Sequence, residues 1–431
     1  MSSAESQYFT IIGLTTAIAV SLYFLIPFVS NMGSVPKGPV VPGLRNWANW
    51  CFANSAIQSL ASLPSFRRWL DQELSEPDTL REKTGLGESE KVSADAWEDA
   101  PLSRTMRGMI EVLNIEGPSK ILSASPLVKA LETLQESHIS RSQQDAQEFL
   151  HMLLESIAAE QNNLPVTESL QQMSIRAARE GRRYKALPFE GAIKSVSTCT
   201  DCRHELRSQT NPFLELTILP PQRSSITLGD CIAHTLQSET IEDYNCVHCQ
   251  IALLKRQGRE TARFESALAA DSNYDLPRDL SRSHVTLERR GSISRLPEIL
   301  ILHINRSLFG AYATRNAIDV TYTETLTLDT TDYALRSFVI HRGSHDRGHY
   351  IAYRRKSGRW YAISDETVRV VDGDTVLGMG GSTFLMFYER IDHAAKEERS
   401  RKRRKRRRRN ARGERSGTED ESSTLLPKSK I

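Results

Sequence analysis

The stretch NWANWCFANSAIQSL, Asn46 to Leu60, places one cysteine between two tryptophans and a polar run. Cys51 is one of only six cysteines in the chain. Its polar neighbours are Asn46, Asn49, Asn54 and Ser55. A structural cysteine usually lies among apolar residues, so this setting predicts chemistry rather than packing. Cys51 lies where a polar loop enters a predicted helix over 53–63, and the free N–H groups of a helix start are expected to lower the pKa of the thiol.

The composition is that of a folded protein with a sizeable core, since 39% of the 431 residues are hydrophobic. The net charge of +3 hides an asymmetry. Lys396 to Arg415 contains 13 Lys/Arg and 3 Asp/Glu, which leaves 43 basic against 50 acidic residues in the rest of the chain. A mildly acidic body argues against nucleic acid as a partner.

Residues 9–29, FTIIGLTTAIAVSLYFLIPFV, form a run of 21 residues without a charge. A helix of that length crosses the hydrocarbon core of a bilayer. A cleaved signal peptide would begin with basic residues, and a buried core helix would keep a polar face. The nearest flanking basic residues, Lys37 and Arg45, follow the run, so the rest of the chain is predicted to lie in the cytosol. We therefore predict a single-pass integral membrane protein.

The chain divides into an N-terminal tail (1–8), a transmembrane helix (9–29), a linker rich in Gly, Pro and Ser (30–42), a globular domain (43–392) and a polar, disordered tail (393–431). Within the domain, helices come first and strands later, which indicates an α+β fold. The expected helix is 143–159, with a start signal at Ser142 and Asp145, and the expected strands are 299–304, 333–341 and 350–354. The charged stretches 73–99 and 262–294 are interpreted as surface insertions.

Two further groups of residues carry chemistry. His349, in RGHYIAYRR, lies beside Gly348 at the start of a predicted strand and is the candidate base for Cys51, although a lone histidine there is more often structural. Cys199-x-x-Cys202 and Cys246-x-x-Cys249 form two pairs that would close a tetrahedral four-thiolate zinc site. Four reduced, metal-free cysteines are the alternative. The remaining cysteine, Cys231, is expected in the core.

The order of these motifs resembles the ubiquitin-specific proteases. GLRNWANWCFANSAIQSL resembles their cysteine box, and GHYIAYRR followed by WYAISDETV resembles their histidine box. The blocks QQDAQEFLHMLLE, FEGAIKSVSTCTDC, NPFLELTI and LPEILILHINRS resemble the intervening family motifs. The resemblance implies a papain-like cysteine protease fold, with thumb, palm and zinc-bearing fingers that hold ubiquitin.

Carried over by position, Cys51 is the nucleophile, His349 its general base, and Asn46 the donor to the oxyanion. Gln144 and Asp145 match the motif near the ubiquitin tail, although Asp145 also suits a helix N-terminus. These roles imply thiol-dependent hydrolysis of isopeptide bonds at the C-terminal glycine of ubiquitin.

Three residues depart from the family pattern. Ala48 and Trp50 replace the usual glycine and threonine, and Ser364 stands where the third member of the triad is usually Asp or Asn. Serine can hold the imidazole through Nδ1–H but lacks the charge of a carboxylate. Asp365, the next residue, is a possible auxiliary, although strand alternation would point it to the opposite face.

Serine at the third position, together with an N-terminal transmembrane helix, resembles the membrane-anchored mitochondrial branch of the family. The outer mitochondrial membrane is therefore the expected address, with the endoplasmic reticulum as the alternative, and the expected substrates are ubiquitinated membrane-associated proteins. The run Arg399–Arg409 suits a solvated tail, a contact with anionic lipid, or a nuclear-import signal, which would conflict with an integral anchor. A catalytically silent ubiquitin-binding scaffold is the alternative function, whereas a zinc-only interaction module leaves the cysteine and histidine boxes unexplained.

Overall fold

The computed structural model describes residues 38–47, 49–74, 101–140, 142, 144–206, 208–271, 274–277, 280, 283–308, 314–343 and 348–393. The predicted membrane segment 9–29, Ala48, the tail beyond residue 393 and most of the charged stretch 73–99 lie outside these residues. No helix within the described ranges is long and apolar enough to cross a bilayer. The chain forms two compact units, Met1–Glu389 and Arg390–Ile431, and the fold below is that of the first.

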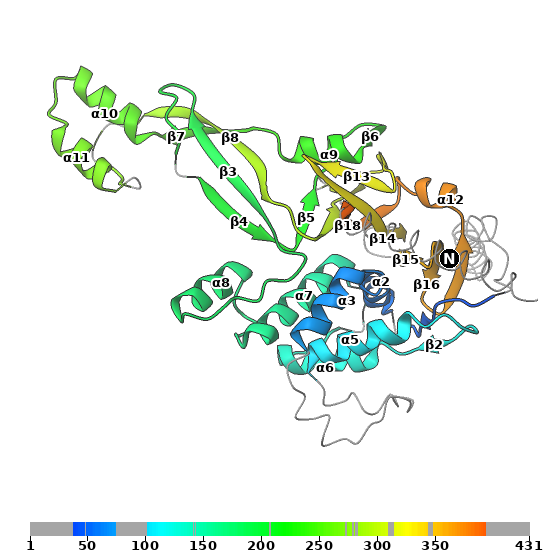
Figure 1. Cartoon of the computed structure of the whole chain (residues 1–431). Coiled ribbons are helices and arrows are strands. Elements are labelled where there is room, and N and C mark those ends of the chain that lie inside the picture. The colour runs from blue at the N-terminus through cyan, green and yellow to red at the C-terminus, as the bar shows by residue number, and fades with distance from the viewer. Residues whose placement is uncertain are drawn as a thin grey trace, which may run out of the picture. The chain divides into compact units, whose positions relative to one another are not determined.

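Helices dominate the first part of the described chain (Figure 1). They are α2 (Cys51–Leu60), α3 (Pro64–Glu73), α5 (Leu102–Leu113), α6 (Ser125–Gln135), α7 (Ala146–Asn162) and α8 (Leu170–Arg179). Pro64 begins α3, where its missing N–H costs nothing. The side chain of Asp145 caps α7 by accepting from the backbone N–H groups of Gln147 and Glu148. The predicted helix 143–159 is therefore present, and it begins after its cap.

A sheet of eight strands holds the second half together. Its members are β5 (Glu215–Ile218), β9 (Ile299–Ile304), β13 (Thr325–Leu328), β14 (Thr331–Gly343), β15 (Gly348–Lys356), β16 (Arg359–Ser364), β17 (Thr367–Val371) and β18 (Thr383–Arg390). The order is β17-β16-β15-β14-β18-β9-β5, with β13 beside β14. Strand β9 is buried on both faces: Ile299 and Ile301 pack in the core shared with the helices, and Leu300 and Leu302 pack in the core on the other face. The other core also holds residues of α9 (Leu228–Thr235), among them the buried Cys231, and of α12 (Gly373–Leu377).

A second, antiparallel sheet carries the cysteine pairs. It consists of β3 (Gly191–Cys199), β4 (Gln209–Phe213), β7 (Glu239–Asn245) and β8 (His284–Arg295) in the order β4-β3-β8-β7, and α10 (Val247–Arg256) and α11 (Ala262–Ala270) follow β7. The interpretation of 262–294 as an insertion is wrong. Strand β8 pairs with both β3 and β7. The prediction failed because β8 is mostly polar. Only three of its twelve residues, His284 to Arg295, are large apolar residues that face the core or its edge.

The segment from Gly38 to Trp47 packs onto the domain. Val40 and Val41 are buried, and Val40 exchanges two backbone hydrogen bonds with Gly117. Strand β1 (Gly43–Leu44) then pairs with β2 (Ile121–Leu122) in parallel. The predicted linker 30–42 therefore ends earlier than expected, since residues 40–42 belong to the fold.

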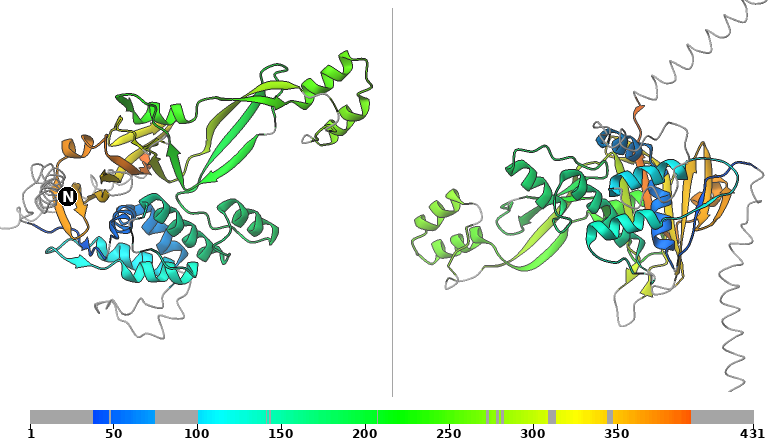
Figure 2. Two further views of the ribbon diagram at one scale, coloured as in Figure 1. Left: turned by 180° about the vertical axis from the view of Figure 1, so that it is seen from behind. Right: turned by 90° about the horizontal axis from the view of Figure 1, so that it is seen from below.

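The remaining short strands form two pairs, β6 (Ser225–Thr227) with β12 (Asp319–Thr321) and β10 (Ser307–Leu308) with β11 (Thr314–Arg315). Helix α2 packs against α7 (Figures 1 and 2), and Figure 1 draws β2, the partner of β1, on the side of α2 away from α7. This arrangement gives the start of α2 two distinct sides.

Candidate functional site

Cys51 is the first residue of α2 and is 3% exposed. Its Sγ lies 3.9 Å from the carbonyl oxygen of Asn49, a residue with φ of 74°. The preceding residue, Trp50, is buried in the core between the helices and the sheet. The structure therefore places the thiol at a helix start, as the sequence predicted, but buries it.

Burial raises the pKa of the Cys51 thiol above its ordinary value, and the negative charge of Asp365 adds to this. Hydrogen bonds from backbone N–H groups, first that of Tyr350, lower the pKa but do not outweigh the effect of burial. The expectation of a lowered pKa is therefore wrong for the protein without substrate. Removal of water disfavours the thiolate more than the helix start stabilises it.

His349 lies in β15, whose next residue, Tyr350, directs its backbone N–H at the sulfur of Cys51. The imidazole Nε2 lies 2.8 Å from Oγ of Ser364, the last residue of β16. Ser364 was expected to accept from Nδ1–H, and this prediction is wrong. Because Ser364 occupies Nε2, the nitrogen left for the thiol is Nδ1.

Asp365 does not point away from the site, as strand alternation had suggested. It lies in the turn between β16 and β17 with φ of 50°, so the alternation of the strand has already ended. Its carboxylate accepts from Nδ2 of Asn46 (2.9 Å) and from Nδ2 of Asn54 (2.8 Å). Oδ2 also lies 3.8 Å from Nε2 of His349. Asp365 thus joins the candidate oxyanion donor, helix α2 and the candidate base.

The electrostatics of Asp365 follow from this position. Burial raises the pKa of its carboxyl above the ordinary value, while the hydrogen bond from Asn54, the charge of His349 and the hydrogen bond from Asn46 lower it. Two amide donors and a nearby imidazole are the groups that a buried carboxylate needs in order to stay ionised.

Strand β1 holds the turn of Asp365 in place. The backbone N–H of Leu44 donates to the carbonyl oxygen of Asp365 at 2.9 Å. A Cβ on Gly43 would lie only 2.7 Å from the carbonyl oxygen of Glu366 and 2.8 Å from that of Asp365. Glycine is therefore required at position 43 for the backbone to approach this turn.

Two features of the structure were assigned no role from the sequence. They are Asn54 and a polar cluster in which Gln147 and His151 of α7 contact Glu215. Asn54 was noted only as a polar neighbour of Cys51. On α7, Nε2 of Gln147 donates to Glu215 of β5 at 2.6 Å, and Nδ1 of His151 lies 2.8 Å from the same Oε1. Hydrogen bonds to Glu155 and Glu215 raise the pKa of His151 to about 10. The EFLHMLLE periodicity placed His151 on a helix but gave no sign of its acidic partner, which is 64 residues away in the sequence.

Gln144 and Asp145 lie directly before α7. The Asp145 carboxylate is engaged as the helix cap, at 2.6 Å from the backbone N of Gln147. Nε2 of Gln144 donates to Oγ of Ser142 at 3.2 Å. The structural interpretation of Asp145 is thus observed, and a role toward an extended peptide remains a prediction.

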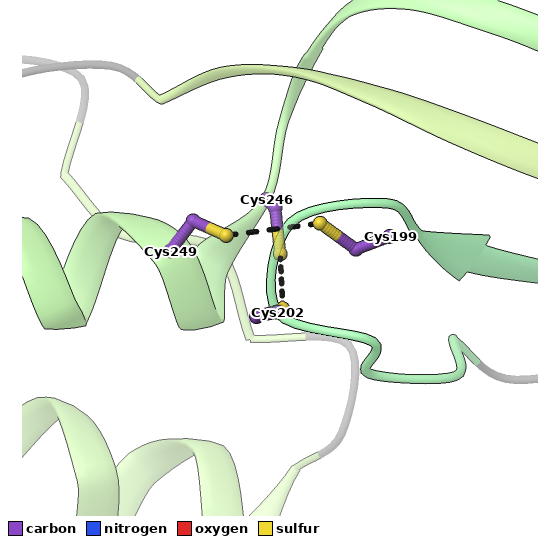
Figure 3. Close-up of side chains that lie close together, drawn as sticks. All are labelled: Cys199, Cys202, Cys246 and Cys249. Atoms are coloured by element: carbon purple, nitrogen blue, oxygen red, sulfur yellow. Dashed lines mark hydrogen bonds between the residues drawn. The ribbon is translucent and has the colours of Figure 1, made fainter.

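The four paired cysteines converge at the ends of β3 and β7 (Figure 3). Their sulfurs all lie within 4.8 Å of one another. Sγ of Cys199 is 3.7 Å from Sγ of Cys249, and Sγ of Cys202 is 3.7 Å from Sγ of Cys246. A disulfide would bring two sulfurs to about 2 Å, whereas a tetrahedron with Zn–S bonds of about 2.3 Å has edges of about 3.8 Å. The donor set and its spacing therefore fit a tetrahedral metal site.

Comparison with known families agrees with this geometry. The family described as "Ubiquitin carboxyl-terminal hydrolase" matches residues 42–388. Ubiquitin carboxyl-terminal hydrolase 16 of Saccharomyces cerevisiae is 28% identical over 417 residues, covering 81% of each chain. Ubiquitin carboxyl-terminal hydrolase 30 of Danio rerio is 26% identical, covering 88% of this chain and 91% of the relative. The relative of Emericella nidulans, another hydrolase 16, is 28% identical, and the match spans 62% of its length.

Solved structures share the fold. The SAGA DUB module bound to monoubiquitin matches with a TM-score of 0.56 at 18% identity, covering 86% of this chain and 74% of that chain. The module bound to ubiquitin aldehyde gives a TM-score of 0.55 at 18% identity.

Proposed function

The chain belongs to the ubiquitin carboxyl-terminal hydrolase family, whose members are cysteine-type deubiquitinases, and we propose that it hydrolyses isopeptide bonds at the C-terminal glycine of ubiquitin. The observation that carries the proposal is the meeting of three segments at the start of α2. The loop before Cys51 brings Asn46, β15 brings His349, and the end of β16 brings Ser364 and Asp365.

The reaction begins from the neutral thiol, because burial raises the pKa of Cys51. Nδ1 of His349 takes the thiol proton as Sγ attacks the carbonyl carbon of the ubiquitin glycine. The Nδ2 amide of Asn46, held by Asp365, donates to the oxygen that becomes negative. When the tetrahedral intermediate collapses, His349 returns the proton to the lysine amine, which leaves. Water then hydrolyses the thioester and restores the thiol.

A single triad carboxylate both orients the imidazole and supplies negative charge, and here Ser364 and Asp365 each provide one of these functions. Ser364 fixes the imidazole through Nε2 at 2.8 Å but has no charge. Asp365 supplies a charge at 3.8 Å and orients Asn46 through its carboxylate. We assign Ser364 as the third triad member and Asp365 as the residue that positions the oxyanion donor.

Ubiquitin itself is expected to lie against α7 and the four-stranded sheet. The shared fold with the SAGA module that binds monoubiquitin supports this placement. Gln144 and Asp145, at the start of α7, then lie beside the extended tail of ubiquitin. The four cysteines would hold Zn²⁺, which stabilises the end of the sheet and takes no part in the hydrolysis.

A membrane anchor through residues 9–29 completes the proposal. The uncharged run of 21 residues and the similarity to ubiquitin carboxyl-terminal hydrolase 30 support a single-pass protein of the mitochondrial branch with a cytosolic catalytic domain. The polybasic tail, 393–431, is suited to contact anionic lipid from the same side.

Replacing Cys51 with alanine tests the enzymatic proposal. Cys51→Ala should abolish hydrolysis of a ubiquitin–fluorophore conjugate and leave ubiquitin affinity within about threefold, because the fold around an alanine is nearly unchanged. Cys231→Ala, at the other lone buried cysteine, should retain activity. Undiminished cleavage by Cys51→Ala would end the cysteine-protease assignment, and an inactive wild-type chain that binds ubiquitin would establish the silent scaffold.

The division of labour at Ser364 and Asp365 predicts distinct variants. Ser364→Ala should lower kcat/KM about 10- to 100-fold, or roughly 1.4 to 2.7 kcal/mol, because the imidazole loses its partner at Nε2. Ser364→Asp should keep substantial activity. Asp365→Ala should also lower kcat/KM, since Asn46 and Asn54 lose their acceptor. A silent Ser364→Ala beside a dead Asp365→Ala would make Asp365 the sole orienting residue.

Elemental analysis tests the metal. We expect one zinc per chain, bound by Cys199, Cys202, Cys246 and Cys249, and we expect Cys202→Ser to lower the occupancy below about half. The control Cys231→Ser should retain the full occupancy. A zinc-free chain that unfolds at the same temperature as the purified protein would contradict a structural metal.

Extraction and proteolysis test the anchor. Alkaline carbonate should leave the full chain in the membrane pellet and release a chain lacking residues 1–37. Protease added to intact organelles should cleave the catalytic domain, since the positive residues follow the span. Release of the full chain by carbonate, or a protected catalytic domain, would show the topology to be wrong.

A further inference from the structure

Trp47 stands on the loop between the candidate oxyanion donor and the nucleophile and is 48% exposed. Its Nε1–H donates to Oγ of Ser123 at 3.2 Å, and the guanidinium of Arg45 lies 5.4 Å from its ring centroid. These two contacts fix the indole while leaving about half of its surface in water. A rigid, half-exposed aromatic offers contact area at a small cost in conformational entropy.

A second exposed apolar side chain lies on the neighbouring strand. Ile121 of β2 is 45% exposed, pairs in register with Gly43, and precedes Ser123 by two residues. Ile121 therefore lies within two residues of the Ser123 hydroxyl that holds the indole. We refer to Trp47 and Ile121 as the apolar ledge. They are two of the six large hydrophobic side chains exposed within the described ranges.

The position of the ledge relative to α2 indicates its occupant. In Figure 1, α7 and the four-stranded sheet lie to one side of α2, and β2, the partner of β1, lies to the other. The proposed function, on which this inference rests, places the ubiquitin tail on the α7 side. A carbonyl carbon over Cys51 then has its leaving nitrogen on the side of β1 and β2.

We propose that the apolar ledge binds the lysine-bearing polypeptide that leaves in the first step. When Sγ of Cys51 bonds to the glycine carbonyl carbon, the bond from that carbon to the lysine Nε breaks, and the nitrogen receives the proton held by His349. The four methylenes of the lysine then have the indole face to pack on, and residues beside the lysine reach Ile121. The exposed cations Arg45 and Lys120 flank the ledge and favour acidic residues near the lysine.

Two substrates that share ubiquitin but differ in the leaving group test the proposal. One is ubiquitin–aminomethylcoumarin, and the other is ubiquitin joined by an isopeptide bond to a lysine within a labelled peptide. The full chain is assayed with both, and the measured quantity is the ratio of the two kcat/KM values. Trp47→Ala should lower kcat/KM for the isopeptide about tenfold more than for the coumarin, Trp47→Phe should restore most of the ratio, and Ile121→Ser should lower it about threefold.

Ile175→Ser is the matched control, because Ile175 has the same chemistry and the same 45% exposure but lies on α8. Its ratio should equal that of the wild type. If Trp47→Ala lowers both kcat/KM values equally, the indole only shapes the oxyanion loop and the proposal is overturned. If the wild type cleaves neither substrate, the proposed function itself fails.

Discussion

Helix α2 has no exposed face, since all ten of its residues are buried. Four of those residues are polar, and each buried polar group needs a hydrogen-bond partner. Nε2 of Gln58 donates to the carbonyl oxygen of Pro42 at 2.9 Å, and Nδ2 of Asn54 donates to the carboxylate of Asp365.

At the other end of α2, the fully buried Arg354 of β15 donates to the carbonyl oxygens of Gln58 at 3.4 Å and Leu113 at 2.5 Å. The three segments that make these hydrogen bonds with α2 are those that carry Asn46, Asp365 and His349. Packing of the nucleophile helix and assembly of the site are therefore one constraint.

The same burial sets the resting state of the site. A thiol whose pKa is raised by desolvation is protonated near neutral pH. In the proposed reaction the thiolate is therefore not preformed, and transfer of the thiol proton to His349 accompanies the attack on substrate. This makes the orientation of His349 more important than it would be for an ion pair, because one particular nitrogen must accept the proton. The contact of Ser364 with Nε2 selects that nitrogen by occupying the other.

Patterns local in sequence predicted their elements well. The apolar run of β9 and the apolar face of α7 were both correct, and the two Cys-x-x-Cys pairs do meet, because burial periodicity and ligand spacing are written in neighbouring residues. The failures arise where a change of backbone conformation or a distant partner decides the outcome. Asp365 turns into the site because φ changes sign one residue beyond the strand, which no alternation rule contains. Strand β8 was missed because its pairing with β3 and β7 stabilises it despite a polar sequence.

The segment before the nucleophile connects the site to the predicted anchor. Residues 30–37 separate the apolar run from Gly38, and an extended chain of that length spans about 30 Å. Val40, two residues after Gly38, exchanges backbone hydrogen bonds with Gly117, and β1 and Trp47 follow it in the chain. In an anchored chain, Gly38 would lie within that distance of the bilayer, and the β1–β2 side of α2 follows it in the chain. With the leaving group on this side, as we infer, and residues 9–29 in the bilayer, as we propose, the lysine that gives up its ubiquitin would lie near the membrane surface. Membrane tethering would then select substrates by position, with the apolar ledge selecting among the lysines that come within reach.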